Sequence, residues 1–246
     1  MESSDYIYGI HSVLEAIDAR RTIDRIYVKN PRSEVAQRAR EAGIPVQVVP
    51  EERLNRFTRK NHQGVVALIS AIDYCDLTTL LPTLFDDGVL PFILVLDGIT
   101  DVRNFGAMAR TAECCGVNAI VIPSRGSVSV GADAVKTSAG ALNHIPVCRV
   151  DNLAVAVKFI RQCGCTIVAA TEKSSVNYTA ADYTVPVAIV MGAEGTGISD
   201  EILKQADVRA AIPPFGRIES LNVGVAAGVM MYEVVRQRLA DNLEVI

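Results

Sequence analysis

Two short apolar segments constrain the fold of this chain more than any other feature. Residues 92–96 and 185–191 contain no polar side chain, and each is followed within two residues by a glycine. A strand without a polar face is typical of a parallel sheet that helices cover on both sides. Around these segments, shorter apolar runs alternate with stretches of helical periodicity. From residue 92 onward the sequence therefore predicts an α/β domain built on a mostly parallel sheet.

The same alternation predicts the individual elements of that domain. The expected strands are residues 92–96, 119–122, 145–148, 166–170, 185–191 and 207–212. The expected helices are residues 104–115, 133–142, 153–163, 200–205 and 222–238.

The chain before residue 73 predicts a second, smaller α/β domain. Its expected helices are residues 10–17, 33–42 and 51–57, and its expected strands are residues 23–28, 46–49 and 65–71. The segment 73–91 contains Pro82, Pro91 and the sequence Asp-Asp-Gly, which are typical of a connection. We therefore expect domains at residues 1–72 and 92–246, joined by a linker at residues 73–91.

The net charge of −4 is unevenly distributed along the chain. Residues 1–72 carry 11 Lys and Arg against 9 Asp and Glu, whereas residues 73–246 carry 13 against 19. A basic surface for nucleic acid is therefore expected in the first domain. The candidate RNA-binding residues are Arg53, Arg56, Arg59, Lys60 and His62. Taken alone, this run is also typical of a solvated face.

Composition disfavours several classes of protein. No apolar run approaches the roughly 20 residues that span a bilayer, and the amino terminus lacks the pattern of a secretion signal. We therefore expect a cytoplasmic protein without membrane association. The six cysteines form no Cys-x-x-Cys pair, so we interpret them as small apolar residues and expect no metal site.

Polar residues gather in three loops that should meet at one edge of the sheet, because ligands bind beyond the carboxyl ends of parallel strands. The first loop follows residues 92–96 and leads into a helix that carries Asn104 and Arg110. Asn104 also fits a helix cap, and Arg110 also fits an ion pair with Glu113 on a solvated face. Both interpretations stay open at this level.

The second loop, residues 192–199, contains three glycines and Glu194. Such a loop allows a ligand to approach the backbone closely, but it matches no nucleotide-binding signature and has no lysine. A carboxylate would repel a phosphate. The loop therefore favours a cofactor that is neutral or positively charged.

The third loop, residues 212–225, places two prolines and a glycine before an apolar helix. Ser220 and Asn222 stand at the start of that helix, where Asn222 also fits a helix cap. A purely structural segment seldom has a rigid bend with polar residues beside an apolar helix. This segment therefore predicts a functional role.

Together, the three loops resemble the three motifs of the SpoU family of RNA 2′-O-ribose methyltransferases. The matching residues are Asn104-x-Gly106-x-x-x-Arg110-Thr111-Ala112, Gly192-x-Glu194-Gly195-x-Gly197, and Ile212-Pro213 with Ser220-Leu221-Asn222-Val223. The likeness covers residues 92–240. The first domain resembles that family's substrate-binding domain through Ile7-Tyr8-Gly9-Ile10-His11 and His62-Gln63-Gly64-Val65. The layout is most similar to the bacterial 23S rRNA guanosine-2′-O-methyltransferase group.

The resemblance implies a fold, a cofactor and an assembly. It implies the deep carboxyl-terminal trefoil knot of the SPOUT superfamily, which patterning alone does not suggest because knots are rare. It also implies S-adenosylmethionine bound in the knot, largely through backbone groups. By position these belong to Gly192, Ile212 and Leu221, with Thr171 at the edge. The apolar final helix agrees with the homodimers of that family.

For catalysis, the resemblance points to Arg110 as the central residue. The family proposal makes this arginine a base, yet a guanidinium with a pKa above about 12 stays protonated. We therefore favour electrostatic stabilisation of the developing alkoxide by Arg110. Asn104 and Glu194 would orient Arg110 and the RNA, while Ser220 and Asn222 would fix the loop and the nucleotide.

Two other functions are compatible with these residues. One is 2′-O-methylation of transfer RNA, because the motifs do not distinguish transfer RNA from ribosomal RNA. The fold also suits a non-catalytic RNA-binding assembly factor. The intact set of Asn104, Arg110, Glu194, Ser220 and Asn222 argues against that alternative.

Overall fold

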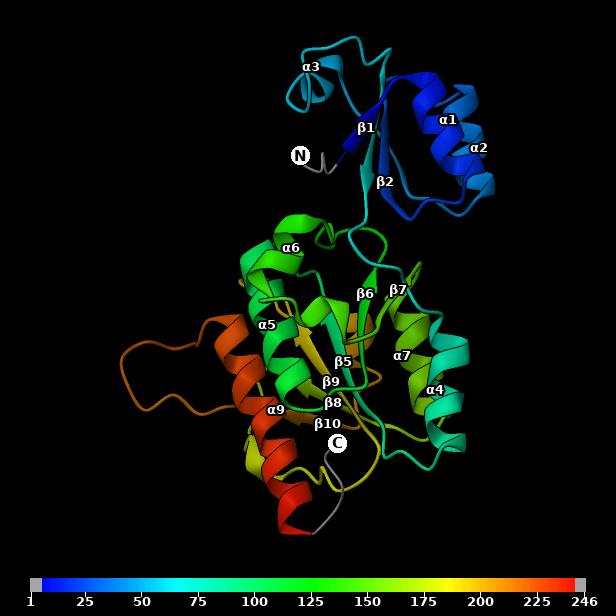
Figure 1. Cartoon of the computed structure of the whole chain (residues 1–246). Coiled ribbons are helices and arrows are strands. Elements are labelled where there is room, and N and C mark those ends of the chain that lie inside the picture. The colour runs from blue at the N-terminus through cyan, green and yellow to red at the C-terminus, as the bar shows by residue number, and fades with distance from the viewer. Residues whose placement is uncertain (1–5, 242–246) are drawn as a thin grey trace. The chain divides into compact units, whose positions relative to one another are not determined.

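The computed structural model describes residues 6–241, which form two compact units (Figure 1). The first unit comprises the chain up to Asp73 together with Ser129–Val135. The second comprises Tyr74–Val128 and the chain from Lys136 onward. Each unit has its own sheet and its own hydrophobic core.

The first unit is a four-stranded sheet in the order β1-β4-β2-β3, with helices on both faces. Its strands are β1 (Tyr6–Tyr8), β2 (Ile23–Val28), β3 (Val46–Val48) and β4 (Val65–Ile69), and its helices are α1 (Ile10–Asp18), α2 (Glu34–Glu41) and α3 (Glu51–Leu54). Successive side chains of a strand point to opposite faces. Ile26 and Val28 pack in the core with α1 and α2, whereas Tyr27 packs with Leu54 of α3.

The second unit is built on a six-stranded sheet in the order β10-β8-β9-β5-β6-β7. Its strands are β5 (Phe92–Asp97), β6 (Ala119–Pro123), β7 (Val147–Val150), β8 (Thr166–Ala170), β9 (Val187–Gly192) and β10 (Val208–Ala210). All neighbouring strands run parallel, as predicted. The two apolar segments become β5 and β9, which pair with each other in the middle of the sheet.

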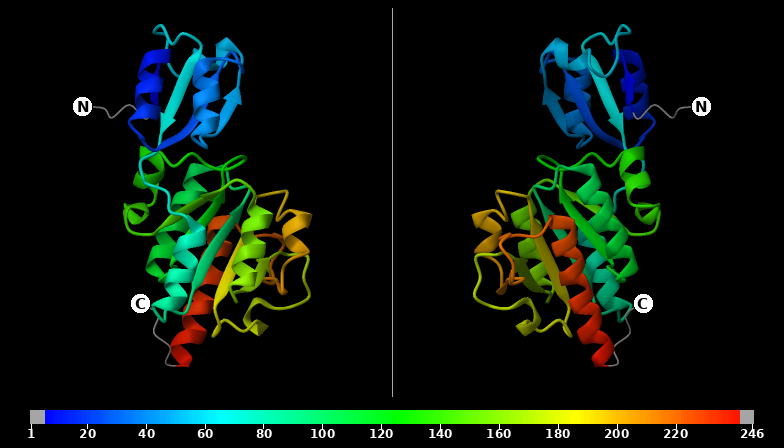
Figure 2. Two further views of the ribbon diagram at one scale, coloured as in Figure 1. Left: turned by 90° about the vertical axis from the view of Figure 1, so that its right-hand side faces the viewer. Right: turned by 90° about the vertical axis from the view of Figure 1, so that its left-hand side faces the viewer.

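Helices cover both faces of this sheet. They are α4 (Leu77–Asp86), α5 (Val102–Cys114), α7 (Leu153–Gln162), α8 (Asp200–Leu203) and α9 (Val223–Ala240), with the single-turn 3₁₀ helices η1 (Ala141–Asn143) and η2 (Tyr178–Ala180). Helix α6 (Ala132–Thr137) begins in the segment that belongs to the first unit. Helices α4, α7 and α8 pack on one face, and α5 and α9 pack together on the other (Figures 1 and 2). Within residues 6–241, no helix is long and apolar enough to cross a membrane.

Helix α4 lies within the predicted linker and was not expected from the sequence. Asp76 caps it by accepting a hydrogen bond from the backbone N–H of Thr78 at 2.7 Å. Pro82 lies inside the helix, where a proline costs roughly 3 kcal/mol. Leu77 and Leu81 are buried against the core, and each contributes about 1.5–3 kcal/mol. Burial of these two leucines offsets the cost of the proline.

Other elements also differ from the prediction. Strand β9 begins two residues later than expected, β4 ends two residues earlier and α3 ends three residues earlier. Residues 133–142, expected as one helix, form α6 and η1, because Ala139 and Gly140 between them have φ angles of 52° and 88°. A positive φ cannot continue a right-handed helix. Strand β7 begins two residues later than expected. Strand β1 was missed because a three-residue strand shows no periodicity.

The six cysteines are free thiols, and three of them fill the core. Burial raises the pKa of Cys115, Cys148 and Cys165 to about 12 in each case. These thiols therefore stay protonated at neutral pH and pack as small apolar groups, as predicted.

Arg238, near the end of α9, is a buried cation held by backbone carbonyls. Its side chain is 4% exposed. The guanidinium donates to the carbonyl oxygens of Leu90, Pro91, Tyr183 and Val185 at 3.0–3.1 Å. Burial lowers its pKa to about 10. Arg238 thus ties the end of α9 to the two segments that enter β5 and β9.

We expect Arg238→Met to lower the free energy of unfolding by about 3–5 kcal/mol, because a largely buried guanidinium would no longer donate to four carbonyl oxygens. Urea unfolding measures this change. Arg161→Met is the matched control, since it removes only a surface ion pair with Asp207 and should cost at most about 1 kcal/mol. Equal losses in the two variants would contradict the structural role of Arg238.

Candidate active site

The second and third polar loops meet at one cavity beyond the carboxyl ends of β8, β9 and β10, whereas no residue of the first loop lines it. The cavity has a volume of 560 Å³. Its wall includes all four residues predicted to bind a cofactor, which are Thr171, Gly192, Ile212 and Leu221. It also includes three of the residues predicted for catalysis, which are Glu194, Ser220 and Asn222.

Asn222 joins the three loops through hydrogen bonds. Its side-chain NH₂ donates to Glu194 Oε1 at 2.7 Å and to Asn104 Oδ1 at 3.0 Å. Its own oxygen accepts from the backbone N–H groups of Gly224 and Val225, so it also caps α9. The cap interpretation and the functional interpretation of Asn222 are therefore both compatible with the structure.

Asn104 does not cap the helix that carries it. Asp101 caps α5 instead, since its carboxylate accepts from the backbone N–H groups of Arg103 and Asn104 at 2.9 and 2.8 Å. The side chain of Asn104 is left to accept the hydrogen bond from Asn222. Its NH₂ group makes no hydrogen bond to any other residue between 6 and 241.

The backbone of the glycine-rich loop packs directly on Gly192. A Cβ at Gly192 would lie 2.2 Å from the carbonyl carbon of Gly197 and 2.3 Å from the backbone nitrogen of Ile198. The loop is closed by a hydrogen bond from the N–H of Gly197 to the carbonyl of Ala193 at 2.8 Å. A glycine is therefore required at position 192, where the loop forms the cavity wall.

The loop at residues 212–221 is held only at its two ends. Before it, the backbone N–H of Ala211 donates to Val176, and after it Asn222 caps α9. Within the described chain, no hydrogen bond involves residues 212–221. The backbone groups of Ile212 and Leu221 are thus available to a ligand in the cavity. The side chains of Phe215 and Ile218 are 97% and 78% exposed.

The charge of the cavity wall is negative. Glu172, Glu194 and Glu219 line it, and no described lining residue is Lys or Arg. Glu172 and Glu219 were missed by the sequence analysis, although each lies next to a residue or motif that it singled out. A wall of this charge disfavours a phosphate group and favours a cationic ligand.

Arg110 lies outside this hydrogen-bond network. It is exposed on α5, it does not line the cavity, and no hydrogen bond links it to Asn104 or Glu194 within the described residues. A separation of six residues turns the helix by about 240° from Asn104, so the two side chains leave α5 on different sides. The predicted orientation of Arg110 by Asn104 and Glu194 is therefore not made in this structure.

The candidate RNA-binding residues fall into two groups. Arg53, Arg56, Arg59 and Lys60 are exposed on α3 and the loop after it. His62 is 6% exposed. Its Nδ1 accepts from the backbone N–H of Gly64 at 3.0 Å, and its Nε2 contacts Asn55 Oδ1 at 3.0 Å. Both ring nitrogens of His62 are therefore used to shape the loop before β4.

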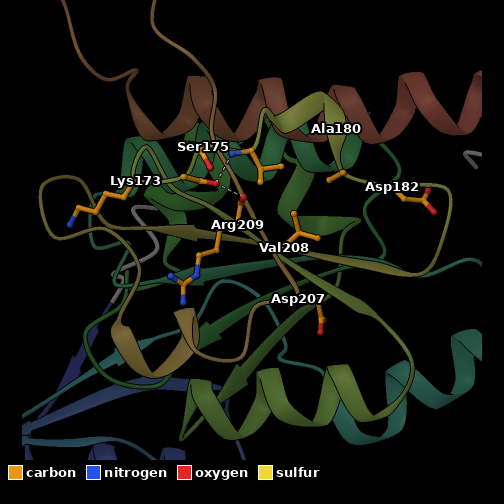
Figure 3. A pocket seen from close by; sticks show the side chains of 10 residues that line it. Lys173, Ser175, Ala180, Asp182, Asp207, Val208 and Arg209 are labelled. Carbon is orange, nitrogen blue, oxygen red and sulfur yellow. Dashed lines mark hydrogen bonds between the residues drawn. The ribbon is translucent and has the colours of Figure 1, made fainter.

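A second hollow lies along β10 at the edge of the sheet (Figure 3). Lys173, Asp182, Asp207 and Arg209 line it, so its charges are mixed. In Figure 3 these side chains point in different directions and do not converge. The guanidinium of Arg209 donates to the carbonyl of Leu203, and Asp207 pairs with Arg161. This hollow lacks the convergent polar groups of an active site.

The fold and the cavity define a class of protein. A parallel α/β sheet carries an acidic, glycine-walled cavity at its carboxyl edge, and a separate small unit carries exposed basic residues. This combination is typical of an enzyme with a neutral or cationic cofactor and a polyanionic substrate.

Comparison with known proteins agrees with that class. Residues 91–232 match the SpoU rRNA methylase family, and residues 6–75 match the domain described as RNA 2′-O ribose methyltransferase substrate binding. The chain belongs to the SpoU family of RNA methyltransferases, as the motifs predicted.

Similar proteins cover almost the whole chain. A protein of Staphylococcus haemolyticus (strain JCSC1435), named for the TrmH family of tRNA/rRNA methyltransferases, is 37% identical over 96% of this chain and 98% of its own length. A Bacillus subtilis (strain 168) protein of the same family name is 34% identical over 96% and 97%. The AdoMet-bound rRNA methyltransferase of Sinorhizobium meliloti is 28% identical, with a TM-score of 0.59 over 94% of this chain and 86% of that one.

Proposed function

We propose that this protein transfers a methyl group from S-adenosylmethionine to a ribose 2′-hydroxyl of RNA, with a guanosine of 23S ribosomal RNA as the first candidate substrate. The observation that carries the proposal is the cavity in which Asn222 links Asn104 and Glu194 beside the free backbone groups of Ile212 and Leu221.

The cavity fits S-adenosylmethionine in charge and in available partners. This cofactor carries a positive sulfonium, a positive amino group and one carboxylate, so its net charge is positive, and three carboxylates line the cavity. Gly192, Ile212 and Leu221 would hold it through backbone groups, with Thr171 at the edge. When bound, the cofactor supplies an electrophilic methyl group. The protein's own residues must position the ribose and assist loss of its hydroxyl proton.

Arg110 is the residue we propose for stabilising the ribose oxygen as negative charge develops on it. Because a guanidinium stays protonated, Arg110 acts electrostatically and not as a base. Asn104 presents its free NH₂ group near the cavity and would position the RNA with Glu194. Ser220, which lines the cavity without a hydrogen-bond partner among residues 6–241, would contact the nucleotide.

Three further features belong to the same proposal. We propose that the segment from β9 to α9 forms the deep trefoil knot of the SPOUT superfamily, since Asn222 ties the start of α9 to the loops after β5 and β9.

We propose a homodimer, because Val225, Tyr232 and Leu239 expose apolar surface on α9. We also propose the cytoplasm as the compartment, since ribosomal and transfer RNA are found there.

In the smaller unit we propose that Arg53, Arg56, Arg59 and Lys60 contact RNA phosphates. His62 would act indirectly, because its nitrogens hold the loop that carries Lys60. Phosphate contacts would make RNA binding weaken as salt concentration rises.

The proposal is tested with the purified protein and RNA from cells that lack it. Calorimetric titration should show binding of S-adenosylmethionine, and mapping of 2′-O-methyl sites before and after incubation should show one new site. A site in transfer RNA would replace the ribosomal assignment. Absence of cofactor binding would favour the assembly-factor alternative.

We expect Asn222→Asp to lower cofactor affinity or turnover by roughly 10-fold to 100-fold and to lower the free energy of unfolding by about 1–2 kcal/mol. An aspartate still caps α9, but its carboxylate would face Glu194 and could not donate. Calorimetry, steady-state kinetics and thermal unfolding separate these effects. Full activity in Asn222→Asp would show that the hydrogen bonds to Glu194 and Asn104 are dispensable.

A further inference from the structure

A hollow of 680 Å³ in the first unit is lined by an unusual number of amide side chains. They are Asn30, Asn55, Asn61 and Gln63, and we call this hollow the amide pocket. Lys29 and Lys60 also line it, as does one carboxylate, that of Glu51. A volume of this size lies in the range of about 300–1,000 Å³ that is usual for small-ligand sites.

The chain's own donors fix the orientation of three of these amides. The backbone N–H of Arg32 donates to Asn30 Oδ1 at 2.9 Å, and that of Gln63 donates to Asn61 Oδ1 at 3.3 Å. The backbone N–H of Ile10 donates to Gln63 Oε1 at 3.0 Å. Because a backbone N–H can only donate, each amide must present its oxygen there and turn its NH₂ group elsewhere.

His62 fixes the orientation of the fourth amide. Its Nδ1 accepts from the N–H of Gly64, so the proton of the neutral ring lies on Nε2. Nε2 therefore donates to Asn55, which must present its oxygen at 3.0 Å. The motif His62-Gln63-Gly64 thus orients two amides of the pocket, Asn55 through the His62 ring and Asn61 through the backbone N–H of Gln63.

All four NH₂ groups are left without a hydrogen bond to any residue between 6 and 241. Lys29 pairs with Glu51 at 2.5 Å, so the one carboxylate of the wall is already engaged. The amide pocket thus offers amide donors and two ammonium groups, and its ionised groups sum to a positive charge. It suits a ligand that is rich in hydrogen-bond acceptors and negatively charged.

We propose that the amide pocket binds one unpaired nucleotide of the RNA substrate, with the keto edge of uracil or guanine toward the amides and its phosphate toward Lys29 and Lys60. Uracil O4 and guanine O6 accept hydrogen bonds, whereas the amino groups of cytosine and adenine at the same positions donate. Sequence-specific RNA recognition uses such unpaired bases. The inference rests on the proposed function, because RNA is the ligand that the proposed reaction requires.

The test compares uracil with cytosine, which differ in shape mainly by the group at position 4. Fluorescence anisotropy of the full chain with short labelled oligo(U) and oligo(C) should show a preference for oligo(U) of roughly fivefold or more. Asn61→Asp keeps the acceptor for Gln63 and changes the free donor into an acceptor. This variant should shift the preference toward oligo(C), and Asn30→Asp should shift it in the same direction.

Asn177→Asp is the matched control. Asn177 forms the same kind of turn, accepting from the backbone N–H of Thr179 at 3.0 Å, but it lies outside the amide pocket. This control adds the same charge and should keep the wild-type ratio of oligo(U) to oligo(C) binding.

Equal binding of the two oligonucleotides by the wild type would overturn the inference, as would an unchanged ratio in both pocket variants. Cofactor titration on the same samples keeps the two proposals apart. Cofactor binding without base preference would reject the amide pocket alone. Base preference without cofactor binding would reject the proposed methyl transfer and still support nucleotide binding by the amide pocket.

Discussion

Gly192→Ala should destabilise the second unit by about 3 kcal/mol, because its new methyl group would overlap three backbone atoms. Those atoms are the carbonyl carbon and oxygen of Gly197, at 2.2 and 2.6 Å, and the nitrogen of Ile198 at 2.3 Å. No side-chain rotation relieves a contact with backbone, so the glycine-rich loop must move. Because this loop forms the cavity wall, affinity for S-adenosylmethionine should fall roughly 100-fold or more. Calorimetry and urea unfolding measure the two effects.

Gly216→Ala is the matched control for that experiment. A Cβ at Gly216 meets no atom within 4 Å, and the residue does not have the positive φ that strains other side chains. Its stability should stay within about 0.5 kcal/mol of the wild type. Wild-type stability and affinity in Gly192→Ala would show that the loop adapts easily, contrary to the tight backbone packing.

Arg110→Ala should reduce turnover by roughly 100-fold to 1,000-fold, the usual cost of removing one stabilising donor from a reaction. Cofactor affinity should not change, because Arg110 does not line the cavity. Methyl transfer to RNA and calorimetric binding of S-adenosylmethionine separate the two quantities. Arg110→Lys should recover only part of the activity, since an ammonium lacks the planar fork of donors.

Arg103→Ala provides the control on the same helix, since Arg103 is also exposed on α5 but lies outside the three motifs. It should keep nearly full turnover. Full turnover in Arg110→Ala would reject the catalytic assignment. Loss of cofactor binding in that variant would instead make Arg110 a structural residue.

Much of the fold could be predicted because it depends on local patterns. The apolar segments at residues 92–96 and 185–191 predicted buried parallel strands, and they became β5 and β9. Prediction failed where tertiary packing opposed the local sequence pattern. Pro82 predicted a connection and not a helix. Helix α4 forms nevertheless because Leu77 and Leu81 are buried against residues from elsewhere in the chain. The break between α6 and η1 was missed because one of its two residues is an alanine, Ala139, with a positive φ.

The candidate site shows the same division. Glu194 in the second loop predicted a cofactor that is neutral or positively charged, and the cavity wall carries three carboxylates. The sequence left open whether Asn104 caps the helix that carries it. In the structure Asp101 takes that role, which leaves Asn104 to Asn222.

The sequence by itself determined the periodicity of the strands, the chemistry of the three loops and the family, because these lie in residue types and short spacings. Only the tertiary structure decided which groups meet. Asn222 contacts Asn104 across 118 residues and Glu194 across 28. The tertiary structure also decided that Arg110 lies outside the hydrogen-bond network of Asn104, Glu194 and Asn222. Contacts over such separations depend on the order of strands in the sheet, and local side-chain patterns do not encode that order.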